Sequence, residues 1–328
     1  MTYTAIGVDV GGTGTKAGLV TDSGDVLLRV ERPTDKSAGT KGIIEAVEEL
    51  LERTPEGDAA SAIGVGAAGF IDASTGSVNF SPNLTYDDPH IADAVGARAH
   101  LPVIVDNDAN AAAWGERAFG AARGLDHVVV MTIGTGIGSG FIIGGRLLRG
   151  STGAGTEFGH TIVDPRGPEC PCGLRGCIEQ FASGGAIARA ARRAAQEDPR
   201  TTLIGFAGSL DSITARHVSQ AAREYDEVAL GVMRDAGRWL GIGLSNIANL
   251  FDPQTIVLGG GVVKAGESFL GVARDTLAAM TAAQRRRPMR LDVTTLGSDA
   301  GIVGAAALAL DEAVPNARDQ GPRAREHS

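Results

Sequence analysis

A unit made of a strand, a glycine-rich loop and a return strand occurs twice in this chain, and this repeat constrains the fold most. The first copy is an apolar strand over residues 5–10, followed by the loop 11–13 and a second strand. The second copy is a strand over residues 127–133 with the loop 134–138, about 120 residues later. Helical periodicity separates the copies, so the sequence predicts two α/β domains around a central cleft.

The length and composition are sufficient for such a pair of domains. The chain has 328 residues, of which 43% are hydrophobic, and its 47 glycines cluster after apolar runs. We expect a small N-terminal domain over residues 1–108 and a larger C-terminal domain over residues 109–312. We allow the last helix to pack back on the first domain. The polar remainder, residues 313–328, is predicted to be a disordered tail.

Charge and hydropathy exclude several classes of partner. The net charge of −9 argues against nucleic acid, whose phosphates need clustered cations. No signal peptide and no apolar stretch of about 18 residues is present, so we expect no membrane partner and a cytoplasmic location.

The glycine loops have the composition of phosphate-binding loops. Asp9 ends the first strand, and the following backbone N–H groups can form an anion-binding nest, while Asp9 can hold Mg²⁺ directly or through water. The alternative for one such loop is a plain glycine hairpin. Three loops at strand ends favour a nucleotide. The predicted contacts are Asp9, Gly11, Gly12, Thr13, Lys16, Gly134, Thr135, Gly136, Gly259, Gly260 and Gly261.

A run of polar residues at the predicted domain junction is the candidate for the catalytic base. Asp106, Asn107 and Asp108 end a strand and lead into an alanine-rich helix. Phosphoryl transfer to a hydroxyl needs a carboxylate that accepts the proton, and it needs polar groups that fix the acceptor. A helix N-cap is the alternative, but a cap requires only one such residue.

One histidine and three cysteines form a candidate metal site. They are His160, Cys170, Cys172 and Cys177, and the segment that contains the cysteines has no helical or strand periodicity. Three cysteines and one histidine make a standard closed tetrahedral zinc site. Free thiols or a redox pair are the alternatives. Four protein ligands leave no open position, so we predict a structural zinc ion.

These motifs resemble known families. The strand, Asp-x-Gly-Gly-Thr loop and later Gly-Thr-Gly turn resemble the sugar-kinase and actin-like ATPase superfamily, whose members have two ribonuclease-H-like domains that bind ATP. The segments 107–116, 157–160 and 170–179 are similar to the sugar-site and zinc signatures of the ROK family. Within that family they look most like bacterial ATP-dependent glucokinases.

The resemblance implies a role for each matched residue. Asp108 corresponds to the catalytic base, and His160 serves both the metal and the sugar. The sugar-binding residues that the resemblance implies are Gly69, Asn83, Asn107, Asp108, Glu157, His160 and Glu179.

The activity implied is ATP-dependent phosphorylation of the 6-hydroxyl of glucose, with Mg²⁺ and a structural Zn²⁺, in a homodimer or homotetramer. N-acetylglucosamine, N-acetylmannosamine, fructose or allose as acceptor, and polyphosphate as donor, are alternatives. A sugar-sensing regulator is another. ROK repressors carry a DNA-binding segment before the kinase-like part, and because the first strand here starts at about residue 4, we expect an enzyme.

Overall fold

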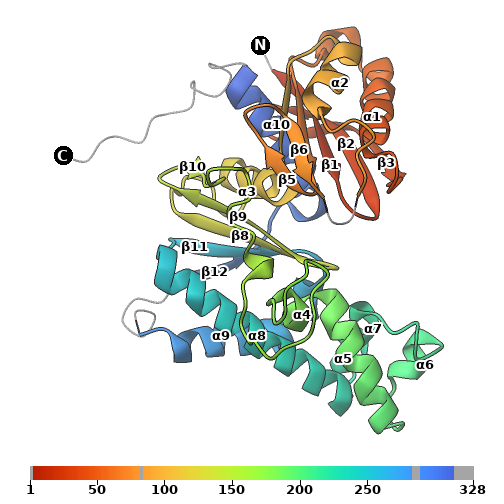
Figure 1. The fold of residues 1–328 in the computed structure, drawn as a ribbon, viewed down its shortest axis with the longest axis vertical. Coiled ribbons are helices and arrows are strands. Elements are labelled where there is room, and N and C mark those ends of the chain that lie inside the picture. The colour runs from red at the N-terminus through yellow and green to blue at the C-terminus, as the bar shows by residue number, and fades with distance from the viewer. Residues whose placement is uncertain (1–2, 82–83, 283–288, 314–328) are drawn as a thin grey trace. The chain divides into compact units, whose positions relative to one another are not determined.

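The computed structural model describes residues 3–81, 84–282 and 289–313, and the chain forms two compact units (Figure 1). Unit 1 comprises Met1–Gly124, Arg149–Gly155 and Ser298–Ser328. Unit 2 comprises Leu125–Leu148 and Thr156–Gly297. Each unit is built on one five-stranded sheet, and each is described separately below.

The sheet of unit 1 has the strand order β3-β2-β1-β4-β7. Strand β1 pairs antiparallel with β2 and parallel with β4, while β3 and β7 form the two edges. The strands are β1 Thr4–Val10, β2 Gly14–Thr21, β3 Val26–Pro33, β4 Ile63–Ala67 and β7 Val103–Asn107. A separate ribbon pairs β5 Phe70–Asp72 with β6 Ser77–Phe80.

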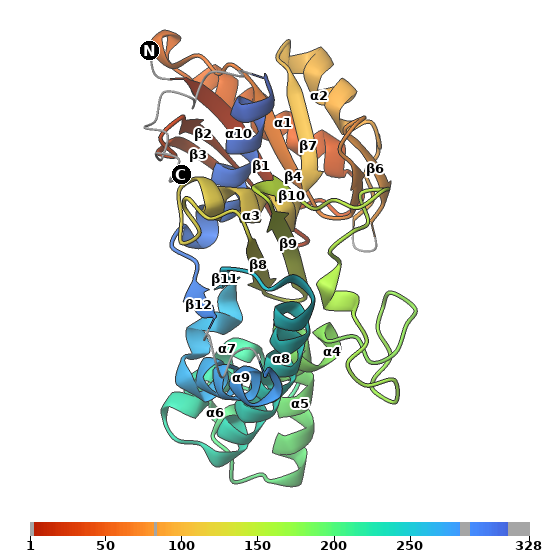
Figure 2. The same cartoon turned by 90° about the vertical axis from the view of Figure 1, so that its left-hand side faces the viewer.

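Helices cover both faces of this sheet (Figure 2). On one face lie α1 Gly39–Arg53 and α2 Ile91–Ala99, and on the other lie α3 Asp108–Ala118 and α10 Ala300–Ala313. A 3₁₀ turn follows α1 at Glu56–Asp58, and another precedes α10 at Gly297–Asp299. A Cβ at Gly7 would overlap the Ile302 carbonyl oxygen, and one at Gly64 would overlap that of Ala305. Helix α10 therefore lies directly on the backbone of the sheet.

The sheet of unit 2 repeats this arrangement, with the order β10-β9-β8-β11-β12. Strand β8 pairs antiparallel with β9 and parallel with β11, as β1 does with β2 and β4. The strands are β8 Val128–Ile133, β9 Ile137–Ile143, β10 Arg146–Leu147, β11 Thr255–Gly259 and β12 Arg290–Val293. The duplicated unit predicted from the sequence is thus present in both sheets.

The helices of unit 2 share one apolar core with its sheet. They are α4 Glu179–Ala182, α5 Gly184–Glu197, α6 Leu203–Ala207, α7 Ala215–Arg223, α8 Glu227–Phe251 and α9 Glu267–Met280, with 3₁₀ turns η2 Phe158–His160 and η3 Gly261–Ala265. Helix α8 begins where the Asp226 carboxylate accepts a hydrogen bond from the Ala229 backbone N–H at 2.9 Å. Its buried face packs on α9, α7 and α5 and belongs to the same hydrophobic core as Met131 and Leu258 of the sheet.

The compact units differ from the predicted boundary at residue 108. Helix α3 belongs to unit 1 because it packs on α10 and on β4, and α10 itself packs on β1 and β4. Unit 2 therefore ends at Gly297 rather than at residue 312. The predicted tail lies, beyond Ala313, outside the described residues.

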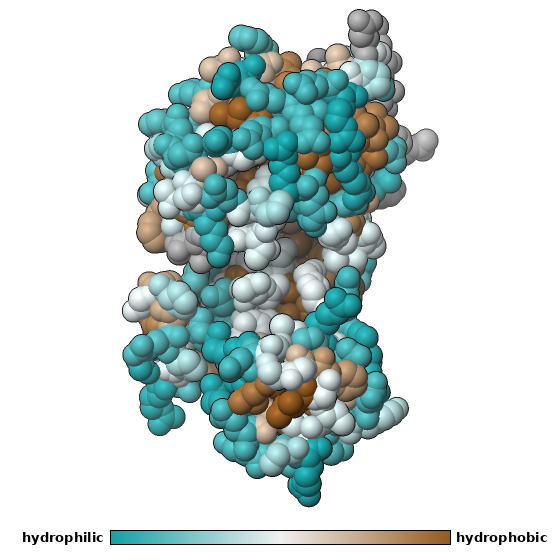
Figure 3. Space-filling model, turned by 90° about the vertical axis from the view of Figure 1, so that its right-hand side faces the viewer, coloured by the Kyte–Doolittle hydropathy of each residue, from teal (hydrophilic) through white to brown (hydrophobic). Residues whose placement is uncertain are grey.

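Hydrophilic residues make up much of the molecular face shown in Figure 3, and hydrophobic residues gather on it in separate patches. Among the helices within residues 3–313 that the structure describes, none is both long enough and apolar enough to cross a membrane.

Candidate active site and metal cluster

The first glycine loop joins β1 to β2 in unit 1. The Gly11 backbone N–H donates to the Gly14 carbonyl at 3.0 Å, and the Thr34 hydroxyl donates to the Gly11 carbonyl at 2.7 Å. The loop is therefore closed by its own backbone and by one side chain of the neighbouring strand end. The N–H groups of Gly12 and Thr13 donate to no other described residue, so they are available to an anion.

The carboxyl groups of Asp9 and Asp108 in unit 1 both have raised pKa values. Burial and then the charge of Asp108 raise the pKa of Asp9 to about 7, although Lys16 opposes the shift. Burial also raises the pKa of Asp108, against the hydrogen bond that the Ala109 N–H donates to it at 2.9 Å. A raised pKa makes a carboxylate a stronger proton acceptor. Tyr86 is near enough for the Asp108 charge, after burial, to raise its pKa as well.

Asn107 connects the start of α3 to Gly69, one of the predicted sugar-binding residues. Its Oδ1 accepts hydrogen bonds from the backbone N–H groups of Ala109 at 2.9 Å and Asn110 at 3.2 Å, so Asn107 is the N-cap. Its Nδ2 donates to the Gly69 carbonyl at 3.1 Å. The cap that the sequence left as an alternative is therefore formed by Asn107, and Asp108 is the first residue of the helix.

Asp106 directly precedes Asn107 in β7, and its partner Arg149 was not predicted from the sequence. The residue is 2% exposed, and its carboxylate accepts hydrogen bonds from Arg149 Nε at 2.7 Å and Asn110 Nδ2 at 2.9 Å. Arg149 comes from the short segment Arg149–Gly155, which belongs to unit 1. No local pattern links two residues so far apart in sequence, so this pair could not be read from the chain.

The second glycine loop joins β8 to β9 in unit 2. The N–H groups of Gly184 and Gly185, at the start of α5, donate to the carbonyls of Gly134 at 2.8 Å and Thr135 at 3.2 Å. The Ile137 N–H donates to Glu179 Oε2 at 2.9 Å. The loop N–H groups of Thr135 and Gly136 donate to no described residue.

A cavity of about 1020 Å³ in unit 2 adjoins this loop. Gly134, Thr135 and Gly261, which the sequence predicted as nucleotide contacts, lie in its wall. The sequence reasoning missed the wall formed by α7, which presents Arg216, Ser219, Gln220 and Arg223. Their i, i+3, i+4, i+7 spacing places them on one helix face. This spacing of polar residues in the sequence could have indicated the polar face of α7 that lines the cavity.

Only one residue of the third predicted loop, 259–261, lines this cavity. Gly261 lies in the cavity wall, whereas Gly259 ends β11 and Gly260 turns the chain between them. The φ of Gly260 is 92°, and a Cβ there would overlap the Ile133 carbonyl. Gly260 is thus required by the turn, and neither it nor Gly259 is among the residues that line the cavity.

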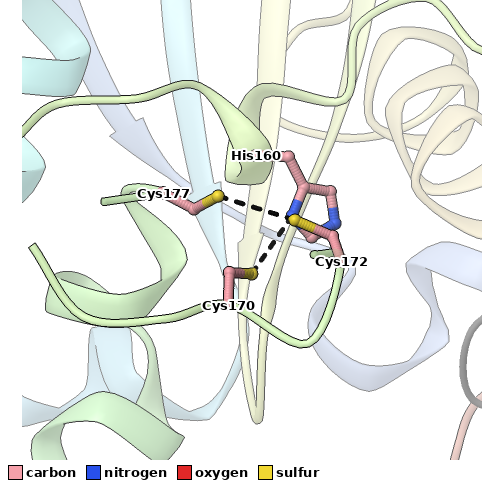
Figure 4. Close-up of side chains that lie close together, drawn as sticks. All are labelled: His160, Cys170, Cys172 and Cys177. Atoms are coloured by element: carbon pink, nitrogen blue, oxygen red, sulfur yellow. Dashed lines mark hydrogen bonds between the residues drawn. The ribbon is translucent and has the colours of Figure 1, made fainter. Parts of the chain in front are cut away.

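The four predicted metal ligands converge, as Figure 4 shows. Their ligand atoms all lie within 4.8 Å of one another. The Sγ atoms of Cys172 and Cys177 are 3.7 Å apart, as are Cys170 Sγ and His160 Nδ1. Two thiolates about 2.3 Å from a tetrahedral zinc ion are about 3.8 Å apart, so the spacing fits zinc.

The electrostatics of the cluster also favour a bound cation. Burial, followed by the hydrogen bonds with Cys172 and Cys170, raises the pKa of the Cys177 thiol to about 12. Three neighbouring thiols cannot all ionise at neutral pH without a compensating positive charge. A zinc ion supplies that charge, and these residues therefore fit the metal that the sequence predicted.

The remaining predicted site residues fall into two groups. Asp9, Gly69, Asn107 and Asp108 belong to unit 1, and the predicted ligands Glu157, His160 and Glu179 belong to unit 2. Glu157 directly precedes η2, which contains His160. Asn83 lies outside the described residues.

Comparison with known proteins covers nearly the whole chain. A model of the ROK family matches residues 5–312. A glucokinase of Streptomyces coelicolor is 40% identical over 310 residues, which are 93% of this chain and 97% of that protein. A glucokinase of Thermotoga maritima is 37% identical over 304 residues, 92% of this chain and 96% of that protein. A solved ROK family glucokinase from Streptomyces griseus, in complex with glucose and AMPPNP, matches with a TM-score of 0.84 and 43% identity, covering 94% of this chain and 99% of that one.

Proposed function

This chain belongs to the ROK family, and on that basis we propose that it transfers the γ-phosphate of ATP to the 6-hydroxyl of glucose. The products are glucose 6-phosphate and ADP. The observation that carries the proposal is the similarity to glucokinases over nearly the full length of both proteins. The Streptomyces griseus relative was solved with glucose and an ATP analogue, which supports both substrates.

Asp108 is the proposed general base. It accepts the proton of the 6-hydroxyl as the oxygen attacks the γ-phosphorus in line, and the ADP oxygen leaves on the opposite side. The raised pKa of Asp108 supports this role, because it makes the carboxylate a better proton acceptor. The helix N-cap Asn107 holds the start of α3 and, through its Nδ2, the Gly69 carbonyl.

The two glycine loops are the proposed phosphate ligands. The N–H groups of Gly12 and Thr13 in unit 1, and of Thr135 and Gly136 in unit 2, would donate to phosphate oxygens. The adenosine would occupy the cavity along α7. Lys16 follows the first loop and would add positive charge. Mg²⁺ would neutralise charge on the phosphates, and Asp9 is the residue that would hold it through water.

The sugar hydroxyls are assigned to the residues that match the ROK family's sugar-binding positions. We assign them to Gly69, Asn83 and Asn107 in unit 1 and to Glu157, His160 and Glu179 in unit 2. The zinc ion would be held by His160, Cys170, Cys172 and Cys177. Since the cluster includes His160 and ends two residues before Glu179, the metal would fix the position of both sugar ligands.

An ADP-release assay with ATP·Mg²⁺ and a panel of hexoses tests the proposal. The panel contains glucose, mannose, fructose, allose, N-acetylglucosamine and N-acetylmannosamine, and polyphosphate replaces ATP in a parallel series. We expect turnover with glucose and ATP to exceed every other pair. Preference for an acetamido sugar would overturn the assignment of glucose as the substrate. No turnover with any pair of sugar and phosphate donor would favour a sugar-sensing protein. Size-exclusion chromatography tests the predicted homodimer or homotetramer.

A further inference from the structure

The Glu179 carboxylate contacts the second glycine loop directly. Its Oε2 accepts the hydrogen bond from the Ile137 N–H at 2.9 Å. A Cβ added at Gly136 would overlap the same oxygen, so the loop backbone packs against the carboxylate with no side chain between them. Glu179 is half-buried, at the start of α4. A residue assigned to the sugar is therefore also in contact with the loop assigned to the phosphates.

This contact fixes one end of the loop. The other end is held by α5, whose first N–H groups donate to the carbonyls of Gly134 and Thr135. Between these attachments lie the N–H groups of Thr135 and Gly136, which point to no acceptor within the described residues. Their direction thus depends on both α5 and Glu179.

The metal cluster contacts Gln180, the residue that follows Glu179 in α4. The backbone N–H of Gln180 donates to the Cys177 carbonyl at 2.9 Å, and Gln180 Nε2 lies 3.4 Å from Cys170 Sγ as a hydrogen-bond donor. Arg189 of α5 donates to Gln180 Oε1 at 2.6 Å. Helix α4 is therefore attached to two of the cysteines and to α5. Movement of the cysteines would displace Glu179.

We propose that Glu179 is a positioning residue that joins the metal cluster to the phosphate loop, so that zinc orders the nucleotide site as well as the sugar site. The inference rests on the proposed function, because it takes loop 134–136 to bind phosphates. Oε2 holds the loop. Oε1 accepts no hydrogen bond from any described residue and is the oxygen left for a sugar hydroxyl.

Titration calorimetry of AMPPNP·Mg²⁺ without sugar tests this role. Glu179→Ala is expected to weaken AMPPNP binding by about 10-fold, because a charge-assisted hydrogen bond to the loop is lost. Glu179→Gln keeps an acceptor oxygen and should stay within about 3-fold of wild type. The matched control is Glu169→Ala, which removes an exposed carboxylate from the same cysteine-rich segment, where it pairs with Arg175 at 2.8 Å. It should leave AMPPNP affinity unchanged.

Hydrogen exchange of peptides covering residues 134–140 gives a second readout that needs no ligand. Exchange should be faster in Glu179→Ala and in wild type stripped of metal, and near wild type in Glu179→Gln. The stripped wild type keeps the test decisive if Glu179→Ala does not fold. Wild-type AMPPNP affinity and wild-type exchange in metal-loaded Glu179→Ala would overturn the proposal.

The same experiments separate this proposal from the proposed function. If wild type binds AMPPNP and Glu179→Ala weakens that binding, but no sugar is phosphorylated, the kinase activity fails and the role of Glu179 stands. If wild type phosphorylates glucose and Glu179→Ala binds AMPPNP normally, only the role of Glu179 fails. A wild-type protein that binds no AMPPNP would overturn both.

Discussion

The two units have the same strand order around their glycine loops, but they support those loops differently. In each, an antiparallel pair, β1 with β2 or β8 with β9, is joined by the loop, and a parallel strand follows on the other side. In unit 1 the Thr34 hydroxyl and the loop's own backbone close the turn. In unit 2 the loop's own backbone also closes the turn, because the Gly134 N–H donates to the Gly136 carbonyl at 2.9 Å, and the added support comes from the Glu179 carboxylate and the first turn of α5.

The surroundings of the loops differ in charge as well. The loop of unit 1 follows Asp9, whose pKa is raised by burial and by Asp108. The loop of unit 2 adjoins a large cavity and, through Glu179, the metal cluster. On the proposed function, the base Asp108 belongs to unit 1, and the sugar ligands next to the metal cluster, His160 and Glu179, belong to unit 2. A variant of the base should then change kcat, and a variant of the metal cluster should change sugar affinity.

Asp108→Asn should have the largest effect. Without the base, kcat should fall by about 10³-fold, while the glucose Kd stays within about 3-fold of wild type, because the amide still fills the site. Steady-state kinetics and titration calorimetry measure the two quantities. The control is Asp211→Asn, an exposed position in unit 2. A kcat within tenfold of wild type would show that Asp108 is not the general base.

Cys177→Ser tests the positioning task of unit 2. The variant should lose zinc, and glucose affinity should fall by about 10- to 100-fold as His160 and Glu179 lose their support. Metal analysis and calorimetry measure this, with Leu174→Ser as a control that changes an exposed side chain in the same segment. A metal-free variant that binds glucose normally would show that the cluster does not position the sugar ligands.

Arg149→Met tests how unit 1 holds its polar junction. Asp106 would be left buried without its cation, and we expect a loss of about 2–3 kcal/mol in the free energy of unfolding. Arg149→Lys keeps the charge and should recover part of the loss. Urea unfolding measures both variants. An unchanged midpoint for Arg149→Met would mean that Asn110 and the backbone satisfy Asp106 unaided.

Asp9→Asn should have the smallest effect of these variants, and it should stabilise the folded protein, whereas the others impair activity, binding or stability. Because the pKa of Asp9 is raised from 3.8 to about 7, ionised Asp9 destabilises the folded chain, and stability falls as the pH rises between these values. The variant should therefore be more stable than wild type at pH 8 without added magnesium, and this advantage should shrink toward pH 4.5. Thermal melts measure it, and Asp211→Asn should show no such trend. A variant less stable than wild type at pH 8 would contradict the cause of the shift.

Local patterns were sufficient for the family, the fold class and the grouping of the four proposed metal ligands. The predicted ROK family and two-domain α/β fold are confirmed. Helix α8 is the kind of element that such patterns indicate, because its N-cap at Asp226 and its amphipathic periodicity are both local in the sequence. The cysteines and His160 were predicted together from donor type and spacing, and they converge in the structure.

Features that depend on long-range packing could not be predicted in the same way. The Arg149–Asp106 pair and the contact of α3 with α10 join segments that are distant in sequence. The sequence left open that the last helix packs on the first domain, but the reason for the packing, the close approach that Gly7 and Gly64 allow, becomes evident only when both partners are known. Glu179 was predicted only as a sugar ligand, and its hydrogen bond from the Ile137 N–H could not be predicted from the sequence.

The proposed reaction transfers one phosphate from ATP to the 6-hydroxyl of glucose. Its stoichiometry is tested by measuring ADP release and glucose 6-phosphate formation in the same reaction, the latter with an enzyme that oxidises only glucose 6-phosphate. We expect equal amounts of the two products at every time point, and loss of both in Asp108→Asn. ADP release without matching glucose 6-phosphate would contradict it.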